Sequence, residues 1–384
     1  MKFKGYLFYM ALLICSCKKE TSKIGVVIDQ TAVNALKINQ YQYLGSHNSY
    51  HKRMSTPLYQ SLKVLNNILP DELDITALDY WHETIEDQLN IYNLRTFEID
   101  IYNDTAGGLF YRRRGNALAG LPEASGIDIL KDPGLKVLHI PDIDFETHVY
   151  TFKDALQKFK NWSDEHPNHV PITILVETKA FSVGSVIGLG FAEPIPFTKE
   201  RCDEIDEEIK SVFGVSLEKI ITPDDVRGSY PTLEEAVLAN NWPTLGESRG
   251  KFMFVMIGEG RDDYLIGHPS LQGRVLFTGA EEGHPEAAVL LFDNPIEDWD
   301  NIIQAISKGY MVRSRCDSPG NQNKTNDYTQ QDAAFRSGAQ ILSTDYYRPD
   351  TRFSTYSCQL PNGDLIRVNP RNVTNASAFE KVVE

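Results

Sequence analysis

Apolar and β-branched runs bounded by turn residues recur along this chain, and segments with helical periodicity separate most of them. A chain in which strands alternate with helices folds its strands into a parallel sheet that the helices cover. Eight runs read as strands: Tyr41 to Ser46, Leu94 to Tyr102, Lys136 to Ile140, Ile172 to Lys179, Lys251 to Gly258, Ala288 to Asp293, Tyr310 to Cys316 and Gln340 to Asp345. Eight strands and their helices within about 310 residues predict an α/β fold, a single-domain (β/α)8 barrel of the TIM type. A doubly wound open sheet is the alternative, but no Gly-x-Gly-x-x-Gly follows the first strand to support it.

Helical spacing is clearest from Thr151 to Asp164, where apolar side chains repeat every three or four residues. Further helices are expected at Pro57 to Asn66, Lys199 to Phe213, Leu233 to Ala239, Glu297 to Lys308 and Thr329 to Ser337. The Gly- and Pro-rich stretch from Ala180 to Phe197 is expected to be a loop that overhangs one end of the barrel.

Side-chain parity supports the barrel, because alternate residues of a barrel strand point into the lumen and toward the helices. In the second strand, Glu98 and Asp100 share one face, and apolar residues share the other. In the fourth strand, Glu177 and Lys179 stand on one face at the C-terminal end. Enzymes with this fold collect their catalytic groups at that end of the strands.

The charge balance excludes one class of partner. The chain has 38 basic and 53 acidic residues, a formal net charge of −15. Such a surface repels polyanions and lacks the basic footprint of a nucleic-acid-binding protein. No nucleic acid is expected as a partner, and the sequence implies no protein partner.

The first 17 residues read as an export signal, with Lys2 and Lys4 ahead of a short apolar run. The run is too short for a stable membrane span. Ile14-Cys15-Ser16-Cys17 resembles a bacterial lipobox, which predicts that Cys17 is lipidated and that the exported protein is a membrane-anchored lipoprotein facing the periplasm or the cell exterior. An ordinary secretory signal is the alternative.

The expected organisation is a lipoprotein-type signal peptide (1–17), a tether (18–38), the barrel (39–350) and a C-terminal extension (351–384). Beyond the signal, the chain has only Cys202, Cys316 and Cys358, which allow at most one internal disulfide. No Cys/His spacing suits a structural zinc site.

Four polar clusters stand at the ends of predicted strands: Gly45 to Asn48, Glu98 to Asp100, His139, and Glu177 to Lys179. Carboxylate and amide oxygens are the ligands that Ca²⁺ prefers, and histidines can move protons and stabilise phosphate charge. The clusters therefore indicate a metal-assisted phosphodiesterase. For the carboxylates, a salt bridge to Arg112, Arg113 or Arg114 is the alternative. No chemistry is assigned to the remaining histidines, which are His51, His82, His148, His166, His169, His268 and His284.

Taken in order, these segments resemble the calcium-dependent phosphoinositide-specific phospholipase C family, within the PLC-like phosphodiesterase barrels. The resemblance spans about residues 40 to 350 and rests on the segments Gln42 to Tyr50, Arg95 to Asp100, Val137 to His139, Ile174 to Glu177 and Gly338 to Tyr346. It implies a bacterial secreted or lipoprotein member that cleaves phosphatidylinositol with Ca²⁺ as cofactor, at a membrane surface.

The resemblance also implies residue roles. Asn48, Glu98, Asp100 and Glu177 would be calcium ligands. His47 would stabilise the phosphoryl group, His139 would protonate the departing diacylglycerol oxygen, and Glu98 or Glu177 would accept the proton of the inositol 2-hydroxyl. Lys179, Arg313 and Arg315 are candidates for substrate binding, although pairing of the two arginines with Asp293 or Asp317 is an open alternative.

Two other functions remain to be separated from this one. A glycerophosphodiester phosphodiesterase of the same superfamily usually opens with His-Arg-Gly, whereas this chain has His47-Asn48-Ser49. An inactive barrel lipoprotein that binds lipid or glycan is the other alternative.

Overall fold

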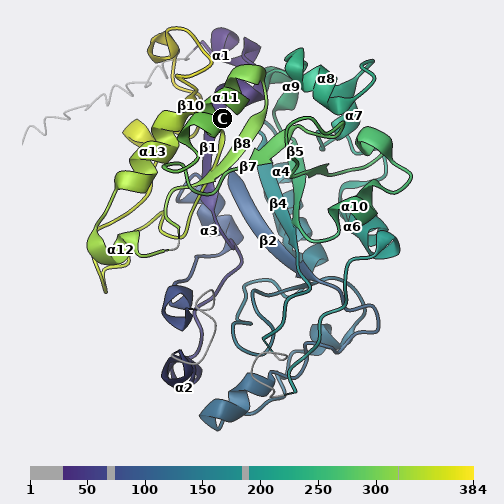
Figure 1. Cartoon of the computed structure of the whole chain (residues 1–384), viewed down its shortest axis with the longest axis vertical. Coiled ribbons are helices and arrows are strands. Elements are labelled where there is room, and N and C mark those ends of the chain that lie inside the picture. The colour runs from purple at the N-terminus through teal and green to yellow at the C-terminus, as the bar shows by residue number, and fades with distance from the viewer. Residues whose placement is uncertain (1–28, 67–73, 184–189, 319) are drawn as a thin grey trace, which may run out of the picture.

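A closed parallel barrel forms the centre of the molecule (Figure 1). The computed structural model describes residues 29–66, 74–183, 190–318 and 320–384. Within these ranges, the eight barrel strands are β1 (Tyr41–Ser46), β2 (Thr96–Tyr102), β4 (Ile172–Thr178), β5 (Phe252–Gly258), β6 (Phe277–Thr278), β7 (Val289–Leu291), β8 (Met311–Arg315) and β9 (Ile341–Thr344). They follow the order β6-β5-β4-β2-β1-β9-β8-β7, and a parallel bridge between Gly279 and Val289 joins the two ends. The predicted TIM-type barrel is confirmed.

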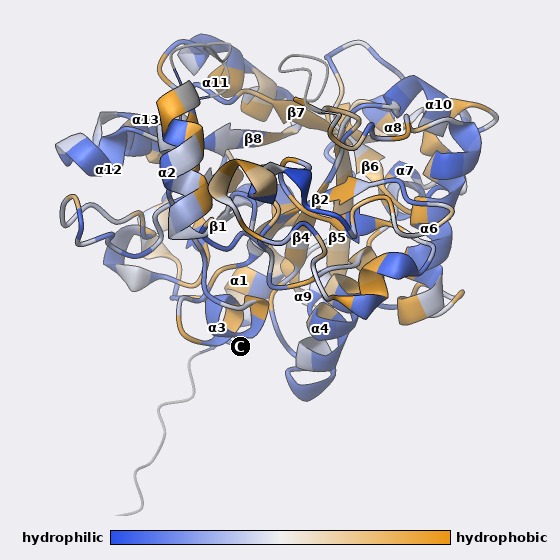
Figure 2. Cartoon of the chain, turned by 90° about the horizontal axis from the view of Figure 1, so that it is seen from below, coloured by the Kyte–Doolittle hydropathy of each residue, from blue (hydrophilic) through white to orange (hydrophobic). Residues whose placement is uncertain are grey.

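The helices alternate with the strands as the sequence predicts. Their bounds are α1 (Thr31–Ala35), α2 (Thr56–Leu65), α3 (Ile85–Asn90), α4 (Phe152–Glu165), α6 (Lys199–Phe213), α7 (Pro223–Arg227), α8 (Leu233–Leu238), α9 (Leu245–Ser248), α10 (Arg261–Leu265), α11 (Trp299–Lys308), α12 (Gln322–Thr325) and α13 (Thr329–Ser337). Short 3-10 helices lie at Ile38–Gln40, Ile75–Leu78, Arg114–Ala119, Asp128–Lys131, Pro269–Leu271, Pro361–Gly363 and Ala376–Ala378. Figure 2 shows the strands surrounded by the helices, with hydrophilic residues along the outer sides of α4, α6 and α10.

One predicted barrel strand is wrong. The run from Lys136 to Ile140 contains only β3 (Lys136–Val137), which pairs antiparallel with the end of β2 and does not enter the barrel. The eighth barrel strand is β6 instead, a two-residue strand that pairs with β5. So short a strand carries too few residues to show an alternating pattern.

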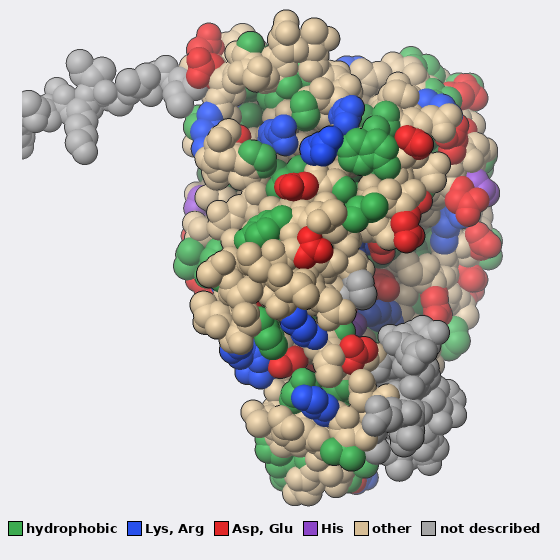
Figure 3. Space-filling model, turned by 60° about the vertical axis from the view of Figure 1, so that its left-hand side comes forward, with side chains coloured by type: hydrophobic (Ala, Val, Ile, Leu, Met, Phe, Trp, Pro, Cys, Tyr) green, Lys and Arg blue, Asp and Glu red, His purple; other side chains and the backbone are tan. Residues whose placement is uncertain are grey.

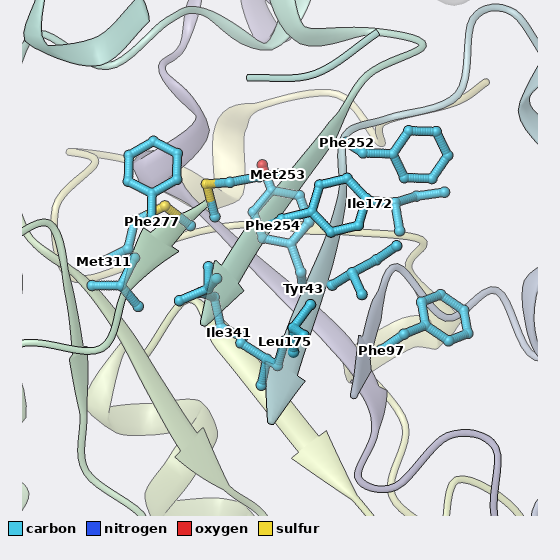
Figure 4. Close-up of a cluster of buried hydrophobic side chains, with 14 of the residues drawn as sticks. Tyr43, Phe97, Ile172, Leu175, Phe252, Met253, Phe254, Phe277, Met311 and Ile341 are labelled. Atoms are coloured by element: carbon cyan, nitrogen blue, oxygen red, sulfur yellow. The ribbon is translucent and has the colours of Figure 1, made fainter. Parts of the chain in front are cut away.

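The barrel interior is apolar at the level where the strands begin, and Figure 4 shows part of this core. Tyr43 and Ile341 are register partners in β1 and β9, and both are buried. On the outer face of β2, the Phe97 ring packs edge-on against Phe159 of α4, with centroids 4.9 Å apart. The parity predicted for β2 is therefore confirmed on its outward side.

The carboxyl ends of the strands point toward one end of the molecule, where Figure 1 places α2 and the long connection between β2 and β4. Of the loop predicted from Ala180 to Phe197, residues 180–183 and 190–197 form neither helix nor strand, and residues 184–189 lie outside the described residues. On the face drawn in Figure 3, basic and acidic side chains of the described residues are interspersed. No helix among the described residues is long and apolar enough to cross a membrane.

The segments outside the predicted barrel pack against it. Residues 31–38, placed by the sequence in the tether, include α1 and bury Val33. In the extension, β10 (Arg367–Val368) pairs antiparallel with the start of β1. The predicted signal peptide and Cys17 lie outside the described residues. Cys202, Cys316 and Cys358 are buried free thiols.

Candidate active site

The end of β1 presents the first cluster. An added Cβ on Gly45 would lie 1.7 Å from the Thr96 carbonyl oxygen, so glycine is required for β1 to approach β2 this closely. His47 follows, and its Nδ1 donates to Asp345 Oδ1 at 2.8 Å. Its Nε2 lies 3.3 Å from Glu98 Oε1. This tautomer leaves Nε2 as the imidazole atom that faces the barrel mouth.

Asn48 adopts a left-handed backbone conformation, with φ of 49°. Its Nδ2 donates to the Tyr80 hydroxyl at 2.9 Å, which turns the amide oxygen away from Tyr80. That oxygen, Oδ1, is buried and accepts no hydrogen bond within the described residues.

Three carboxylates from neighbouring strands converge beside this loop. Glu98, Asp100 and Glu177 each offer a carboxylate oxygen, and these three oxygens lie within 4.8 Å of one another. Asp100 and Glu177 are register partners in β2 and β4, which explains their approach. Burial raises the pKa of Asp100 well above its usual value, and Glu177 and Glu98 add to this effect. A cation is therefore needed to keep all three groups ionised together.

Lys179 supplies one positive charge at this cluster. Its ammonium group forms an ion pair with Asp100 and lies 3.2 Å from Glu177 Oε2. Burial opposes the charge, yet Asp100 and Glu177 raise the pKa of Lys179 above its usual value. The ammonium group thus stays protonated between two carboxylates.

Two arginines of β8 occupy the opposite side of the mouth. Arg313 pairs with Asp293 and donates to Glu98 Oε2 at 3.0 Å. Arg315 donates to Asp345 Oδ2 at 2.8 Å, and its Nη1 lies 3.0 Å from His47 Nε2. The alternative in which Arg313 pairs with Asp293 is confirmed. Arg315 pairs with Asp345 rather than with the Asp317 carboxylate.

His139 does not come from a barrel strand but from the segment after β3. Its Nδ1 donates to Asp144 Oδ2 at 2.8 Å, and His51 Nε2 lies 3.0 and 2.9 Å from the two oxygens of the same carboxylate. Burial and the nearby Lys179 ammonium lower the pKa of His139 to about 4. Burial opposes the charge of Glu177, yet Lys179 foremost, with His47 and His139, holds the pKa of this carboxyl below its usual value.

The structure brings the predicted carboxylates of Glu98, Asp100 and Glu177 together. His47, Lys179 and Arg313 contact these carboxylates, and Arg315 contacts His47. Asn48 precedes Ser49, whose backbone N–H donates to the Glu98 carbonyl oxygen, and His139 lies close enough to Lys179 for its charge to act on the imidazole. The suggested salt bridge to Arg112, Arg113 or Arg114 is wrong for the carboxylates: Arg112 pairs with Glu123, and Arg113 pairs with Glu146.

Sequence reasoning missed four members of the site: Asp345, Asp144, His51 and Tyr80. Asp345 ends a predicted strand, so its position could have been noticed. The other three lie in connections, and no periodic pattern places them.

Comparison with known proteins now adds to this geometry. The sequence model of the family described as phosphoinositide phospholipase C, Ca²⁺-dependent, matches residues 36–370. The chain belongs to this family.

Among solved structures, a calcium-dependent phosphoinositol-specific phospholipase C from a Pseudomonas species is similar, with 16% identity, a TM-score of 0.49, and coverage of 89% of this chain and 98% of the other. A Ca²⁺-dependent phosphatidylinositol-specific phospholipase C from Streptomyces antibioticus has 16% identity and a TM-score of 0.49, with coverage of 82% and 96%. A comparison with curated protein sequences found no match.

As a member of the Ca²⁺-dependent phosphoinositide phospholipase C family, the protein is a phosphoric diester hydrolase that uses Ca²⁺. The residues present fit this ion. Asn48 Oδ1 and Asp100 Oδ1 are both buried without a hydrogen-bond partner in the described part of the chain. Glu98 and Glu177 add two more oxygen donors beside Asp100. An all-oxygen donor set with several carboxylates suits calcium.

Proposed function

We propose that the enzyme cleaves phosphatidylinositol at the glycerol–phosphate bond, releasing diacylglycerol and a cyclic inositol phosphate that water later opens. The convergence of Glu98, Asp100 and Glu177, with His47 Nε2 at 3.3 Å from Glu98 Oε1, carries this proposal. Asn48 and the three carboxylates would hold Ca²⁺. The bound ion would lower the pKa of the inositol 2-hydroxyl and neutralise charge on the phosphoryl oxygens.

The chain's own groups then divide the proton transfers. As the 2-hydroxyl oxygen bonds to phosphorus and the glycerol oxygen leaves, Glu98 or Glu177 takes the hydroxyl proton and protonated His139 gives its Nε2 proton to the leaving oxygen. In its doubly protonated form His47 donates from Nε2, which lies beside Arg315, to a phosphoryl oxygen and stabilises the charge there. A bound phosphodiester anion favours the protonated form of His139, which opposes the lowering of its pKa by burial and Lys179.

The state of the cations supports plain phosphatidylinositol as substrate. Lys179, Arg313 and Arg315 are each already paired with carboxylates. Their charge is thus largely neutralised before any ring phosphate arrives. We propose that they bind the ring hydroxyls.

The decisive experiment measures inositol phosphate release from phosphatidylinositol vesicles, with glycerophosphocholine and a ring-phosphorylated inositide as comparison substrates. Turnover should require added Ca²⁺ and stop in excess chelator. His47→Ala and His139→Ala should each lower the rate by about a hundredfold or more. His284→Ala is the control, because this side chain is 47% exposed and its Nδ1 lies 3.7 Å from Glu286 Oε1. Full turnover in chelator, or preference for glycerophosphocholine, would reject the proposal.

We also propose that the protein is exported and held at the membrane by a lipid on Cys17. The apolar run before Ile14-Cys15-Ser16-Cys17 supports this. Metabolic labelling with a radioactive fatty acid should mark the full-length protein and leave Cys17→Ser unlabelled. Equal labelling of both, or none of either, would contradict the lipid anchor.

A further inference from the structure

A second cluster of titratable groups lies next to the carboxylates but shares no residue with them. His51, His139 and Asp144 have ligand-type atoms within 4.8 Å of one another. Both histidines direct a ring nitrogen at the Asp144 carboxylate, at 2.8 to 3.0 Å. These are hydrogen-bond distances, so the cluster is explained by two N–H donors on one acceptor.

The backbone around Asp144 is built to hold this carboxylate in place. Ile140 and Asp144 exchange two backbone hydrogen bonds of 2.9 Å, which close a tight turn directly after His139. Asp142 lies in that turn with a positive φ of 67°, and its carboxylate accepts from the backbone N–H groups of Arg114 and Ala192, each at 2.6 Å. His139 and Asp144 are therefore set in one rigid unit.

Two further contacts fix the turn and the histidine backbone. An added Cβ on Gly115 would lie 1.9 Å from the Asp142 carbonyl oxygen, so the neighbouring segment packs directly on the turn. The Tyr102 hydroxyl donates to the His139 carbonyl oxygen at 2.9 Å. The imidazole is thus held both through its backbone and through Nδ1.

His51 approaches the same carboxylate from the segment after β1. It is fully buried, and its ring stacks on Tyr80 with centroids 4.3 Å apart. Its Nδ1 is buried and has no hydrogen-bond partner among the described residues, so a proton there would be an unsatisfied buried donor. The geometry favours donation from His51 Nε2 to the Asp144 carboxylate.

Two donors keep Asp144 ionised. Burial opposes its charge, yet His51 and the hydrogen bonds from both histidines hold the pKa of Asp144 below its usual value. An ionised Asp144 accepts from His139 Nδ1 and does not compete for its other proton. His139 Nε2 is then the atom left to exchange a proton with substrate.

We propose that Asp144 and His51 are positioning residues of the reaction: Asp144 selects the tautomer and ring orientation of His139, and His51 secures the Asp144 carboxylate. This inference rests on the proposed role of His139 as the acid that protonates the leaving oxygen. Asp144 and His51 touch no reacting atom. Loss of either side chain should lower the rate only for substrates whose leaving group needs a proton.

The test compares two substrates with each variant of the full chain. One is phosphatidylinositol, whose alkoxide leaving group needs protonation, and the other is an aryl ester of inositol 1-phosphate, whose phenolate leaves without it. Asp144→Asn should lower turnover of the lipid by about a hundredfold or more and of the aryl ester by less than about tenfold. Glu146→Gln is the matched control, because it makes the same change two residues away in a pair with Arg113 and should alter neither rate.

A second pair of variants serves if Asp144→Asn does not fold. His51→Gln keeps an N–H donor and should retain most lipid turnover, whereas His51→Phe keeps the ring without the donor and should lose lipid turnover selectively. A thermal shift on adding Ca²⁺ should persist in all folded variants, because they leave the carboxylate cluster unchanged.

His139→Ala separates failure of this inference from failure of the proposed function. If His139→Ala lowers turnover of both substrates equally, the acid role itself is rejected. The positioning role is overturned if His139→Ala lowers turnover of the lipid alone, but Asp144→Asn and His51→Phe lower turnover of both substrates equally or of neither.

Discussion

The Lys179 ammonium group supplies positive charge at the carboxylate cluster where a metal cation would bind. This group neutralises Asp100 and Glu177, the two carboxylates that β2 and β4 bring into register. A divalent ion entering the same cluster meets a positive charge already there. Lys179 therefore stabilises the ion-free protein and competes with Ca²⁺.

Lys179→Met should strengthen calcium binding and weaken the ion-free fold. Without the ammonium group, the apparent Kd for Ca²⁺ should fall by about tenfold, because a nearby like charge is removed. The melting temperature in chelator should fall, because the three carboxylates then repel one another. Calorimetric titration without substrate measures the first effect, and thermal unfolding measures the second.

Lys199→Met is the control, because Lys199 pairs with Asp203 on the surface of α6. It should change neither quantity. An unchanged calcium affinity in Lys179→Met would show that displacing the lysine costs no binding free energy, and would contradict the predicted competition.

At the scale of elements, the close contact of β1 with β2 carries the site. Gly45 allows this contact, and Ser49 Oγ accepts from the Glu98 backbone N–H at 2.8 Å just beyond it. The loop that bears His47 and Asn48 is thus tied to the strand that bears two carboxylates. A displacement of β1 moves the two halves of the site apart.

Gly45→Ala should therefore lower both stability and turnover. The new Cβ would overlap backbone atoms of Thr96, and such overpacking costs about 1 to 3 kcal/mol. Urea unfolding measures the loss, and the calcium titration should show weaker binding. Gly246→Ala is the control, because its Cβ would meet nothing closer than 3.3 Å. Equal stability of the two variants would contradict the close-approach argument.

At the scale of the whole molecule, buried histidines make stability depend on pH. His169 is fully buried; its Nδ1 donates to the Val170 carbonyl oxygen at 2.6 Å, and its Nε2 accepts from the Ser163 hydroxyl at 2.9 Å. Burial lowers the pKa of His169 to about 4. Burial likewise lowers the pKa of His82 to about 3.

Below the unfolded pKa of about 6.5, the unfolded chain binds protons at these histidines and the native chain does not. The free energy of unfolding should therefore be unaffected by them above pH 6.5 and should fall as the pH drops from 6.5 toward the native pKa values, about 4 for His169 and about 3 for His82. Each histidine contributes a slope of at most about 1.4 kcal/mol per pH unit. Urea unfolding across this range should show a smaller slope for His169→Gln than for the parent chain; identical slopes would contradict the assignment.

The sequence by itself determined the elements and much of the site. The barrel follows from alternating strands and helices, and the inward direction of Glu98 and Asp100 follows from strand parity. Both are local properties, since the period of a strand or helix depends only on neighbouring residues. Parity also indicated that Glu177 and Lys179 share the mouth.

Only the tertiary structure decided the remaining contacts. The barrel takes β6 in place of the predicted third strand. Lys179 pairs with Asp100, and Asp144 links His51 to His139. These contacts join segments whose sequence patterns are unrelated. Such contacts depend on how the barrel closes and where its connections pack, and no local periodicity encodes that.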